Sequence, residues 1–165
     1  MPGIPRFSTA AILRELSLHG VDFIVVGGVA AVLGGVPVQT FDIDIVHSRK
    51  PDNVARLQAA LAGLHATYRS RPDLALKPNE SHLSSPGHQL LITRYGPLDV
   101  LGNIGRSRGY DELLPHTLHL DIADGLRVHV LDLETLIAVK EEVAGERDLA
   151  VLPIMRRTLE EKRQK

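Results

Sequence analysis

Two carboxylates follow a pair of glycines in the first third of the chain. The glycines are Gly27-Gly28, and after a spacer of 13 residues the chain reads Asp42-Ile43-Asp44. Side chains two apart in a strand point to the same face with Cα atoms roughly 7 Å apart, so Asp42 and Asp44 can converge on hard cations. Glycines after a buried strand leave N–H groups at a helix start free for a phosphate. The pattern predicts a triphosphate beside its metal ions, with Mg²⁺ as the simplest neutraliser.

A second interpretation of the same strand needs no ligand. The two carboxylates would then form the solvent face of an amphipathic strand, while Phe41, Ile43 and Ile45 would face the core. Two like charges on one strand face repel each other unless something neutralises them. The alternation of residues fits both interpretations, and the glycine pair favours the ligand.

Two later charged residues stand in apolar surroundings. Asp99 lies between Leu98 and Val100 after a Gly-Pro break, and the alternative is a polar residue that merely follows a turn. If Asp99 joins the other two carboxylates, three of them can hold two metal ions about 3.5–4 Å apart, the spacing suited to an in-line displacement. Lys140 occupies the next position of a helical stripe that includes Ile137. Its ammonium group must either extend to solvent or meet an anion.

The composition limits the classes of protein that fit the chain. A length of 165 residues is enough for one domain, residues 1–165, with its own core. With 19 Lys and Arg against 20 Asp and Glu, any contact with nucleic acid must be local. The absence of cysteine excludes disulfides and thiol catalysis. Residues 1–6 do not read as a signal peptide, and glycines and Pro37 break the uncharged run 23–41, so we expect a cytoplasmic protein outside the membrane.

Local patterns predict alternating helices and strands. The expected helices run from the Ser8 cap to about Leu18, from Val29 to Leu33, from Pro51 along a stripe to Leu64, from the Asp132 cap to about Val143, and from about Glu146, with Pro153 interrupting or kinking the last. The expected strands are Phe23 to Val26, Phe41 to Val46, Gln89 to Arg94 and Leu98 to Leu101, and a hairpin of Thr117 to Ile122 with Leu126 to Val130. The segment from His65 to His88 shows no sustained period and is expected to be a long loop.

The first motif resembles the signature of the nucleotidyltransferases of the DNA-polymerase-β superfamily. That signature is an apolar residue, Gly, Gly or Ser, a spacer, and Asp-x-Asp in a strand, and this chain supplies Val26-Gly27-Gly28 and Asp42-Ile43-Asp44. Residues 25–35 and 40–46 look especially similar to the small toxin-type nucleotidyltransferases of the AbiEii group. A Rossmann interpretation fails because no G-x-G-x-x-G can be drawn through these glycines. The resemblance implies an α/β nucleotidyltransferase fold, with a small mixed sheet, helices mainly on one face, and C-terminal helices.

The same resemblance implies a role for the glycines and the carboxylates. Gly27 and Gly28 would cradle the triphosphate of an NTP. Asp42 and Asp44 would bind two Mg²⁺ ions, with Mn²⁺ as the alternative metal. Asp99 would join them and help to activate the acceptor hydroxyl.

The resemblance also implies roles in the C-terminal part of the chain. Lys140 would contact the nucleotide phosphates, and Asp148, in the sequence Gly-Glu-Arg-Asp, would support the site. Asp148 is equally well explained as a first-turn residue favoured by a helix dipole. The glycine-rich segment after Asp99 carries Arg106 and Arg108, which either grip phosphate or belong to a solvated connection.

The predicted function is metal-dependent transfer of a nucleoside monophosphate from an NTP to an acceptor hydroxyl, with release of pyrophosphate. For the toxin-type group, the resemblance suggests tRNA or a protein as the acceptor and an antitoxin protein as a partner. A second interpretation keeps the chemistry and makes the acceptor an antibiotic or another small molecule. A third is a non-catalytic nucleotide-binding or partner-binding module, against which the three carboxylates and Lys140 argue.

Overall fold

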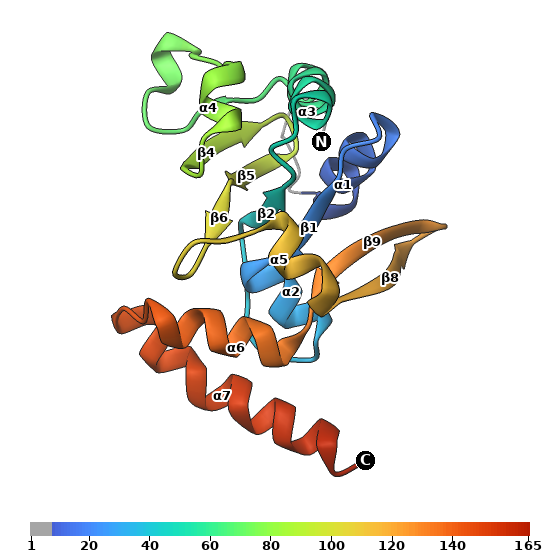
Figure 1. Cartoon of the computed structure of the whole chain (residues 1–165), viewed down its shortest axis with the longest axis vertical. Coiled ribbons are helices and arrows are strands. Elements are labelled where there is room, and N and C mark those ends of the chain that lie inside the picture. The colour runs from blue at the N-terminus through green and yellow to red at the C-terminus, as the bar shows by residue number, and fades with distance from the viewer. Residues whose placement is uncertain (1–7) are drawn as a thin grey trace, which may run out of the picture.

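The protein, in a computed structural model, is built on a sheet of seven strands in the order β3-β4-β5-β2-β1-β9-β8 (Figure 1). The structure describes residues 8–165, apart from the side chains of Glu146 and Arg147. The expectation that the chain begins without a signal peptide rests on residues outside this range. The strands of the sheet are β1 Phe23–Val26, β2 Ile43–His47, β3 Thr67–Tyr68, β4 His88–Thr93, β5 Gly96–Leu101, β8 Thr117–Ala123 and β9 Leu126–Leu131, and β6 Asn103–Ile104 with β7 Arg108–Gly109 forms a separate pair.

The sheet is mixed, as the sequence predicts. Strand β1 pairs antiparallel with β2 and parallel with β9, and β2 pairs parallel with β5. On β2, Ile43 and Ile45 are fully buried, opposite Leu98 and Val100 of β5, which are also fully buried. Because successive side chains of a strand alternate between faces, the residues between these apolar pairs point to the other face of the sheet.

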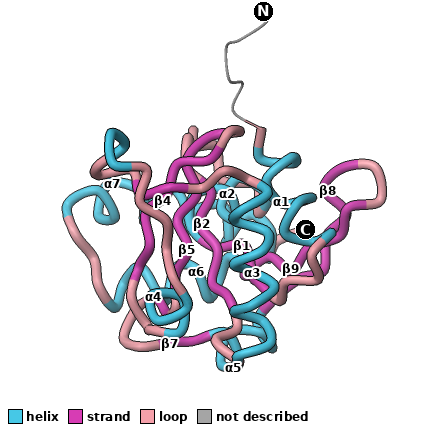
Figure 2. Tube along the Cα trace, turned by 90° about the horizontal axis from the view of Figure 1, so that it is seen from above, coloured by secondary structure: helices cyan, strands magenta, loops and turns pink. Residues whose placement is uncertain are grey.

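Helices surround the sheet in two groups. They are α1 Thr9–Leu18, α2 Gly27–Leu33, α3 Pro51–Gly63, α4 Glu80–Ser84, α5 Tyr110–Leu113, α6 Leu133–Glu142 and α7 Glu146–Arg163, with single 3-10 turns at Pro72–Leu74 and Leu114–His116. Helices α1 and α3 pack side by side against the sheet (Figure 2). Helix α6 packs against α2 and α7. The C-terminal helices α6 and α7 lie at the end of the molecule opposite to α3 and α4 (Figure 1). None of the described helices is long and apolar enough to cross a membrane.

Most helix starts follow from local capping. Ser8 caps α1, because the Ala11 N–H donates to Ser8 Oγ at 3.2 Å, and Asp132 caps α6 by accepting from the Thr135 N–H at 2.7 Å. Pro51 stands at the first position of α3, where its missing N–H costs no hydrogen bond. These three helices therefore begin where the sequence predicts.

The segment expected to be a long loop contains regular structure instead. It holds β3, a 3-10 turn and α4. Helix α4 starts with a reciprocal cap in which the His82 N–H donates to Asn79 Oδ1 at 2.9 Å and the Asn79 N–H donates to His82 Nδ1 at 3.1 Å. Leu83 is its one buried residue. A helix this short has no periodicity to detect, so its existence depends on packing against α3.

Two other boundaries differ from the prediction. Strand β2 begins at Ile43, so Asp42 precedes the strand, and Phe41 is 73% exposed rather than directed to the core. Helix α7 continues through Pro153 without interruption. Leu152 and Met155 are buried on either side of the proline, and this packing holds the helix together despite the lost hydrogen bond.

Candidate active site

Asp44 and Asp99 lie directly opposite each other on the central parallel strands β2 and β5. Neighbouring strands are about 4.8 Å apart and paired residues point to the same face, so the two carboxyl groups lie side by side. The buried apolar neighbours of each aspartate anchor the strands on the other face. Asp42, in the segment before β2, is close enough for its charge to act on Asp44. The structure therefore brings together the three carboxylates that the sequence singles out.

The surroundings of Asp44 oppose its ionisation. Burial raises the pKa of Asp44 from 3.8 to about 8, with further contributions from a hydrogen bond to Asp99 and from the charges of Asp99 and Asp42. Lys140 acts in the opposite direction and lowers this pKa. Carboxylates that crowd a poorly solvated site cannot all ionise at neutral pH unless a cation joins them.

Asp99 is a buried carboxylate with incomplete pairing. Its side chain is 14% exposed, and Arg69 Nη2 lies 3.0 Å from Asp99 Oδ1. This contact is an ion pair that lacks hydrogen-bond geometry, since Oδ1 is buried and accepts no hydrogen bond from the part of the chain that the structure describes. Buried carboxylate oxygens normally accept hydrogen bonds. A lone pair left over at this oxygen is suited to a metal ion.

The glycine pair makes room for the side chains around it. Gly27 has a φ of +66°, and a Cβ at this position would overlap Asp44 Oδ2. A Cβ at Gly28 would lie 2.6 Å from Thr40 Oγ1. Gly27 therefore needs to be glycine both for its backbone conformation and for the close approach of the carboxylate. Gly28 allows the segment that leads to Asp42 to pass close to the start of α2.

Two adjoining cavities carry the candidate residues. The first, of ≈ 320 Å³, which we call the carboxylate cavity, is lined by Gln39, Thr40, Phe41, Asp42, Asp44 and Asp99. The second, of ≈ 270 Å³, which we call the lysine cavity, is lined by Gly28, Ala31, Val38, Gln39, Thr40, Lys140, Asp148 and Val151. Gln39 and Thr40 line both cavities. Residues from β2, β5, α2, α6 and α7 thus face one continuous site.

Lys140 and Asp148 form an ion pair in the lysine cavity. Lys140 Nζ donates to Asp148 Oδ1 at 2.9 Å, and the two side chains are 26% and 29% exposed. Asp148 Oδ2 also accepts from the Gly145 N–H at 3.2 Å, at the start of α7. Asp148 therefore caps a helix and also lines the lysine cavity, and its role toward a nucleotide stays a prediction.

The three aspartates have the character of a divalent-metal site. Carboxylate oxygens are the ligands that Mg²⁺ prefers. Asp44 is held next to Asp99 by the sheet, and Asp99 Oδ1 has an unused lone pair within the described residues. Among the described residues, no group of three or more His, Cys, Asp or Glu side chains is already arranged to hold a metal ion. The residues fit a metal that completes its ligand set with substrate oxygens and water.

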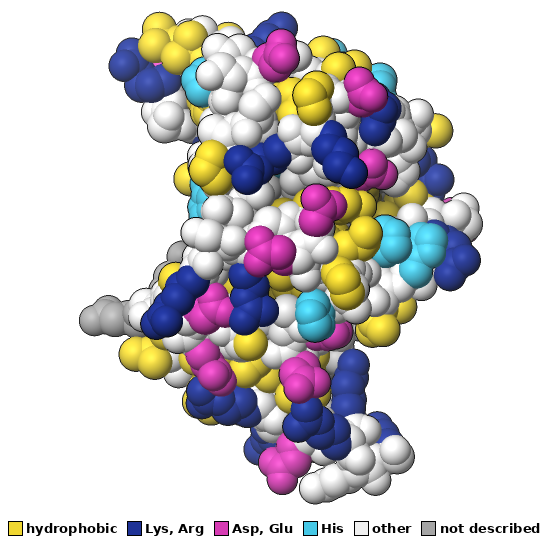
Figure 3. Space-filling model, viewed as in Figure 1, with side chains coloured by type: hydrophobic (Ala, Val, Ile, Leu, Met, Phe, Trp, Pro, Cys, Tyr) yellow, Lys and Arg dark blue, Asp and Glu magenta, His cyan; other side chains and the backbone are white. Residues whose placement is uncertain are grey.

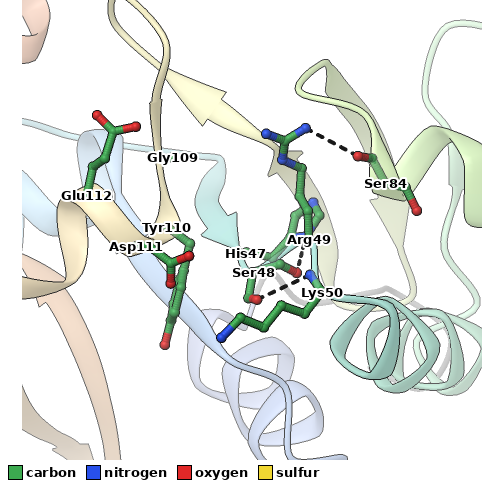
Figure 4. A pocket seen from close by; sticks show the side chains of 9 residues that line it. All are labelled: His47, Ser48, Arg49, Lys50, Ser84, Gly109, Tyr110, Asp111 and Glu112. Atoms are coloured by element: carbon green, nitrogen blue, oxygen red, sulfur yellow. Dashed lines mark hydrogen bonds between the residues drawn. The ribbon is translucent and has the colours of Figure 1, made fainter.

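A larger cavity, of ≈ 430 Å³, lies at the other end of β2 (Figure 4). Arg49 and Lys50 line it from the segment after β2, and Asp111 and Glu112 line it from α5. Side chains of both signs can balance one another without a ligand, whereas the carboxylate cavity gathers like charges. For this reason we place the candidate active site in the carboxylate cavity.

The arginine-bearing segment after Asp99 forms the hairpin β6–β7. The Arg106 N–H donates to Glu142 Oε2 at 2.8 Å, and the Arg108 side chain is ion-paired with Glu142. Gly105, at φ +59°, lets the hairpin approach this carboxylate. Arg106 and Arg108 therefore help to dock the hairpin on α6, and the question of a phosphate contact stays open.

Sequence reasoning missed three residues that line the carboxylate cavity, and it predicted for Arg69 either a phosphate contact or a solvated position, not a contact with Asp99. Gln39, Thr40 and Phe41 line the carboxylate cavity, and Arg69 contacts Asp99. Thr40 carried a local signal, since Thr40 Oγ1 donates to the Asp42 carbonyl at 3.2 Å and shapes the segment before β2. The sequence around Arg69 gives no local signal, because Arg69 and Asp99 are 30 residues apart and meet only in the folded sheet.

Solved structures of similar fold support this architecture. No family model matches the chain, and no curated protein matches its sequence. A protein from Thermotoga maritima that is assigned as a nucleotidyltransferase matches with a TM-score of 0.55 and 17% identity over 92% of this chain and 89% of that one. ANT(2″)-Ia, in complex with adenylyl-2″-tobramycin, matches with a TM-score of 0.56 and 15% identity over 90% of this chain and 85% of its own. The chain therefore has the mixed α/β fold of these nucleotidyltransferase structures.

Proposed function

We propose that the protein is a metal-dependent nucleotidyltransferase, which moves a nucleoside monophosphate from an NTP to an acceptor hydroxyl and releases pyrophosphate. The observation that carries this proposal is the alignment of Asp44 with Asp99 in a cavity that Asp42 also lines. The fold shared with two nucleotidyltransferase structures supports it. The adjoining lysine cavity supplies the cation and the glycine backbone that a triphosphate needs.

In the proposed reaction, each residue acts on the charge of a reacting atom. Asp42, Asp44 and Asp99 would hold Mg²⁺, which when bound neutralises phosphate oxygens and brings the reactants together. Asp99 would accept the proton of the acceptor hydroxyl as its oxygen bonds to the α-phosphorus. The bond from that phosphorus to the bridging oxygen breaks, and pyrophosphate leaves with the electron pair. Lys140 would balance the negative charge of the leaving group.

The experiment that tests the proposal is label transfer. The protein is incubated with Mg²⁺, each α-labelled NTP, and either total tRNA or cell extract. Transfer that is lost in Asp44→Ala supports the function. A matched control is Asp121→Ala, which removes an exposed carboxylate of β8 and should leave transfer unchanged. The absence of any label that depends on Asp44 would instead favour a non-catalytic nucleotide-binding or partner-binding module.

The acceptor is the finer part of the proposal. The resemblance of residues 25–35 and 40–46 to the toxin-type group favours tRNA or a protein, with an antitoxin protein as partner and a cytoplasmic location. Label on RNA or on a protein band would support this assignment.

A second candidate is an antibiotic or another small molecule as the acceptor. The specific observation that favours it is the similarity to ANT(2″)-Ia, which was solved with adenylyl-2″-tobramycin and is covered over 85% of its length. Label recovered on a small molecule rather than on RNA or protein would select this candidate.

A further inference from the structure

Arg69 reaches the carboxylate cavity from the edge of the sheet. It follows β3, and its N–H donates to the Leu90 carbonyl of β4 at 3.0 Å. Its side chain then crosses β4, where Nη1 donates to the Leu91 carbonyl at 3.1 Å, and Nη2 reaches Asp99 Oδ1 on β5. Two hydrogen bonds to the main chain of β4 thus aim the guanidinium group at one carboxylate oxygen.

Arg69 contacts a carboxylate oxygen whose negative charge favours a bound cation. Asp99 Oδ1 is buried and lacks a hydrogen-bond donor among the described residues. A metal ion held between Asp44 and Asp99 would need lone pairs of these same carboxyl groups. Two cations cannot approach one buried oxygen closely without strong mutual repulsion.

We propose that Arg69 and a divalent metal ion are alternative partners of Asp99. Arg69 is then a positioning residue that neutralises Asp99 in the metal-free protein and moves away from it when metal binds. This inference rests on the proposed function, because it takes the metal site of that function as given. The Arg69 side chain is 32% exposed, so solvent can receive the displaced guanidinium group.

A neighbouring ion pair provides a matched comparison. Arg71 pairs with Asp73 at 3.2 Å, with side chains 60% and 64% exposed. Such solvated pairs contribute little, whereas a pair with a mostly buried carboxylate is screened much less. Removing Arg71 changes the net charge by the same amount as removing Arg69 but leaves Asp99 paired.

The first test measures the binding of Mn²⁺ alone, and the electron paramagnetic resonance signal of the free ion monitors this binding. Arg69→Met should bind Mn²⁺ about tenfold more tightly than the wild type, because a weakly screened ion pair no longer competes with the metal. Arg71→Met should bind it as the wild type does. Arg69→Lys keeps the charge but loses the second donor that holds the group against Leu91, so its affinity should lie between those of the wild type and Arg69→Met. Equal affinities in Arg69→Met and the wild type would overturn the proposal.

The second test uses the wild-type chain and so does not depend on whether a variant folds. Phenylglyoxal modifies accessible arginines, and mass spectrometry reports the rate at each site. Saturating Mn²⁺ should raise the modification rate of Arg69 several-fold and leave that of Arg71 unchanged. A rate at Arg69 that stays constant or falls would show that the arginine keeps its place when metal binds.

The two proposals fail in different ways. If the wild type and Arg69→Met both fail to bind Mn²⁺, the metal site itself is wrong. If the wild type binds Mn²⁺ and loses that binding in Asp44→Asn, but Arg69 has no influence, only the inference about Arg69 is wrong.

Discussion

The carboxylate cavity and the lysine cavity adjoin, but the charged side chains that line them are arranged in opposite ways. In the first, Asp42, Asp44 and Asp99 share one sign, Arg69 compensates Asp99 alone of the three within the described residues, and burial raises the pKa of Asp44 to about 8. In the second, Lys140 and Asp148 neutralise each other across 2.9 Å while both remain about a quarter exposed. The first is held on central strands with fully buried neighbours, and the second spans two C-terminal helices.

This difference indicates which of the two cavities a bound ligand stabilises more. Like charges on a rigid sheet destabilise the protein until a proton or a cation neutralises them. An ion pair between two helices is satisfied without a ligand, and an incoming phosphate has only to compete with a partly solvated carboxylate. We therefore expect metal to change the stability of the protein strongly and nucleotide to change it weakly.

The largest effect should come from Asp44→Asn. Loss of a proposed metal ligand should reduce nucleotidyl transfer by about 10³-fold or more, as for other groups that stabilise transition-state charge. In buffer with EDTA the same variant should be as stable as the wild type or more stable, because a repulsive charge is removed. Label transfer measures the loss of activity, and thermal unfolding measures the stability in EDTA. A marked loss of stability without metal would show that Asp44 has a structural role instead.

The next effect is on the pH dependence of stability. The pKa of Asp44 is raised from 3.8 to about 8 in the folded protein, so between these values the folded state binds more protons than the unfolded state. The free energy of unfolding should therefore fall as the pH rises through this range, by on the order of a few kcal/mol. Urea unfolding in EDTA measures this fall. It should vanish in Asp44→Asn, and saturating Mg²⁺ should reduce it, because the metal takes the place of the proton.

A smaller effect should separate two glycines with positive φ. Gly27→Ala combines a strained backbone with an overlap between the new Cβ and Asp44 Oδ2, and should cost about 2–4 kcal/mol. Gly125→Ala, at φ +79° in the β8–β9 turn, adds a Cβ with nothing within 4 Å and should cost about 1 kcal/mol. Urea unfolding measures both costs. Similar losses would mean that Asp44 moves away from Gly27 without penalty.

The smallest effect should come from the lysine cavity. In a double-mutant cycle, Lys140→Met and Asp148→Asn should show a coupling below about 1 kcal/mol in stability, since the pair is partly solvated. Lys140→Met should nevertheless raise the KM for the NTP, whereas Asp148→Asn should change it less. A coupling energy as large as the predicted fall in the free energy of unfolding with pH would show that the lysine cavity is as strongly affected by its charges as the carboxylate cavity.

The sequence predicts well those elements whose cause is local. Ser8 and Asp132 cap helices through residues three positions away, and the apolar run of β1 is buried at every position. The glycine pair and the Asp-Ile-Asp motif lie at two adjoining cavities because β1 and β2 pair with Val26 opposite Asp44. The central sheet could thus be predicted from short stretches of the chain.

The remaining features depend on contacts between distant residues. Helix α7 passes through Pro153 because Leu152 and Met155 pack into the core, which local propensity does not reveal. The exposure of Phe41 depends on where the segment before β2 meets Gly28. Arg69 enters the site only because β3, β4 and β5 lie in that order. Roles of residues in the reaction likewise stay predictions until the label-transfer experiment is done.

Figure 3 shows acidic and basic side chains interspersed over one face of the molecule. Two ion pairs join α6 and α7: Arg156–Glu141, at 3.0 Å, and Arg163–Glu134, at 3.3 Å. Both pairs are solvated and contribute little individually. The position of α7 therefore depends mainly on buried Leu152 and Met155 and on the start of the helix.

The cap at the start of α7 links ligand occupancy to backbone protection. Asp148 accepts both from Lys140 and from the Gly145 N–H. A phosphate that draws Lys140 away would remove one competing contact of the carboxylate and strengthen its hydrogen bond to the Gly145 N–H. The Gly145 amide should then exchange its hydrogen with solvent more slowly, so one backbone position becomes a reporter of nucleotide binding that needs no substrate turnover.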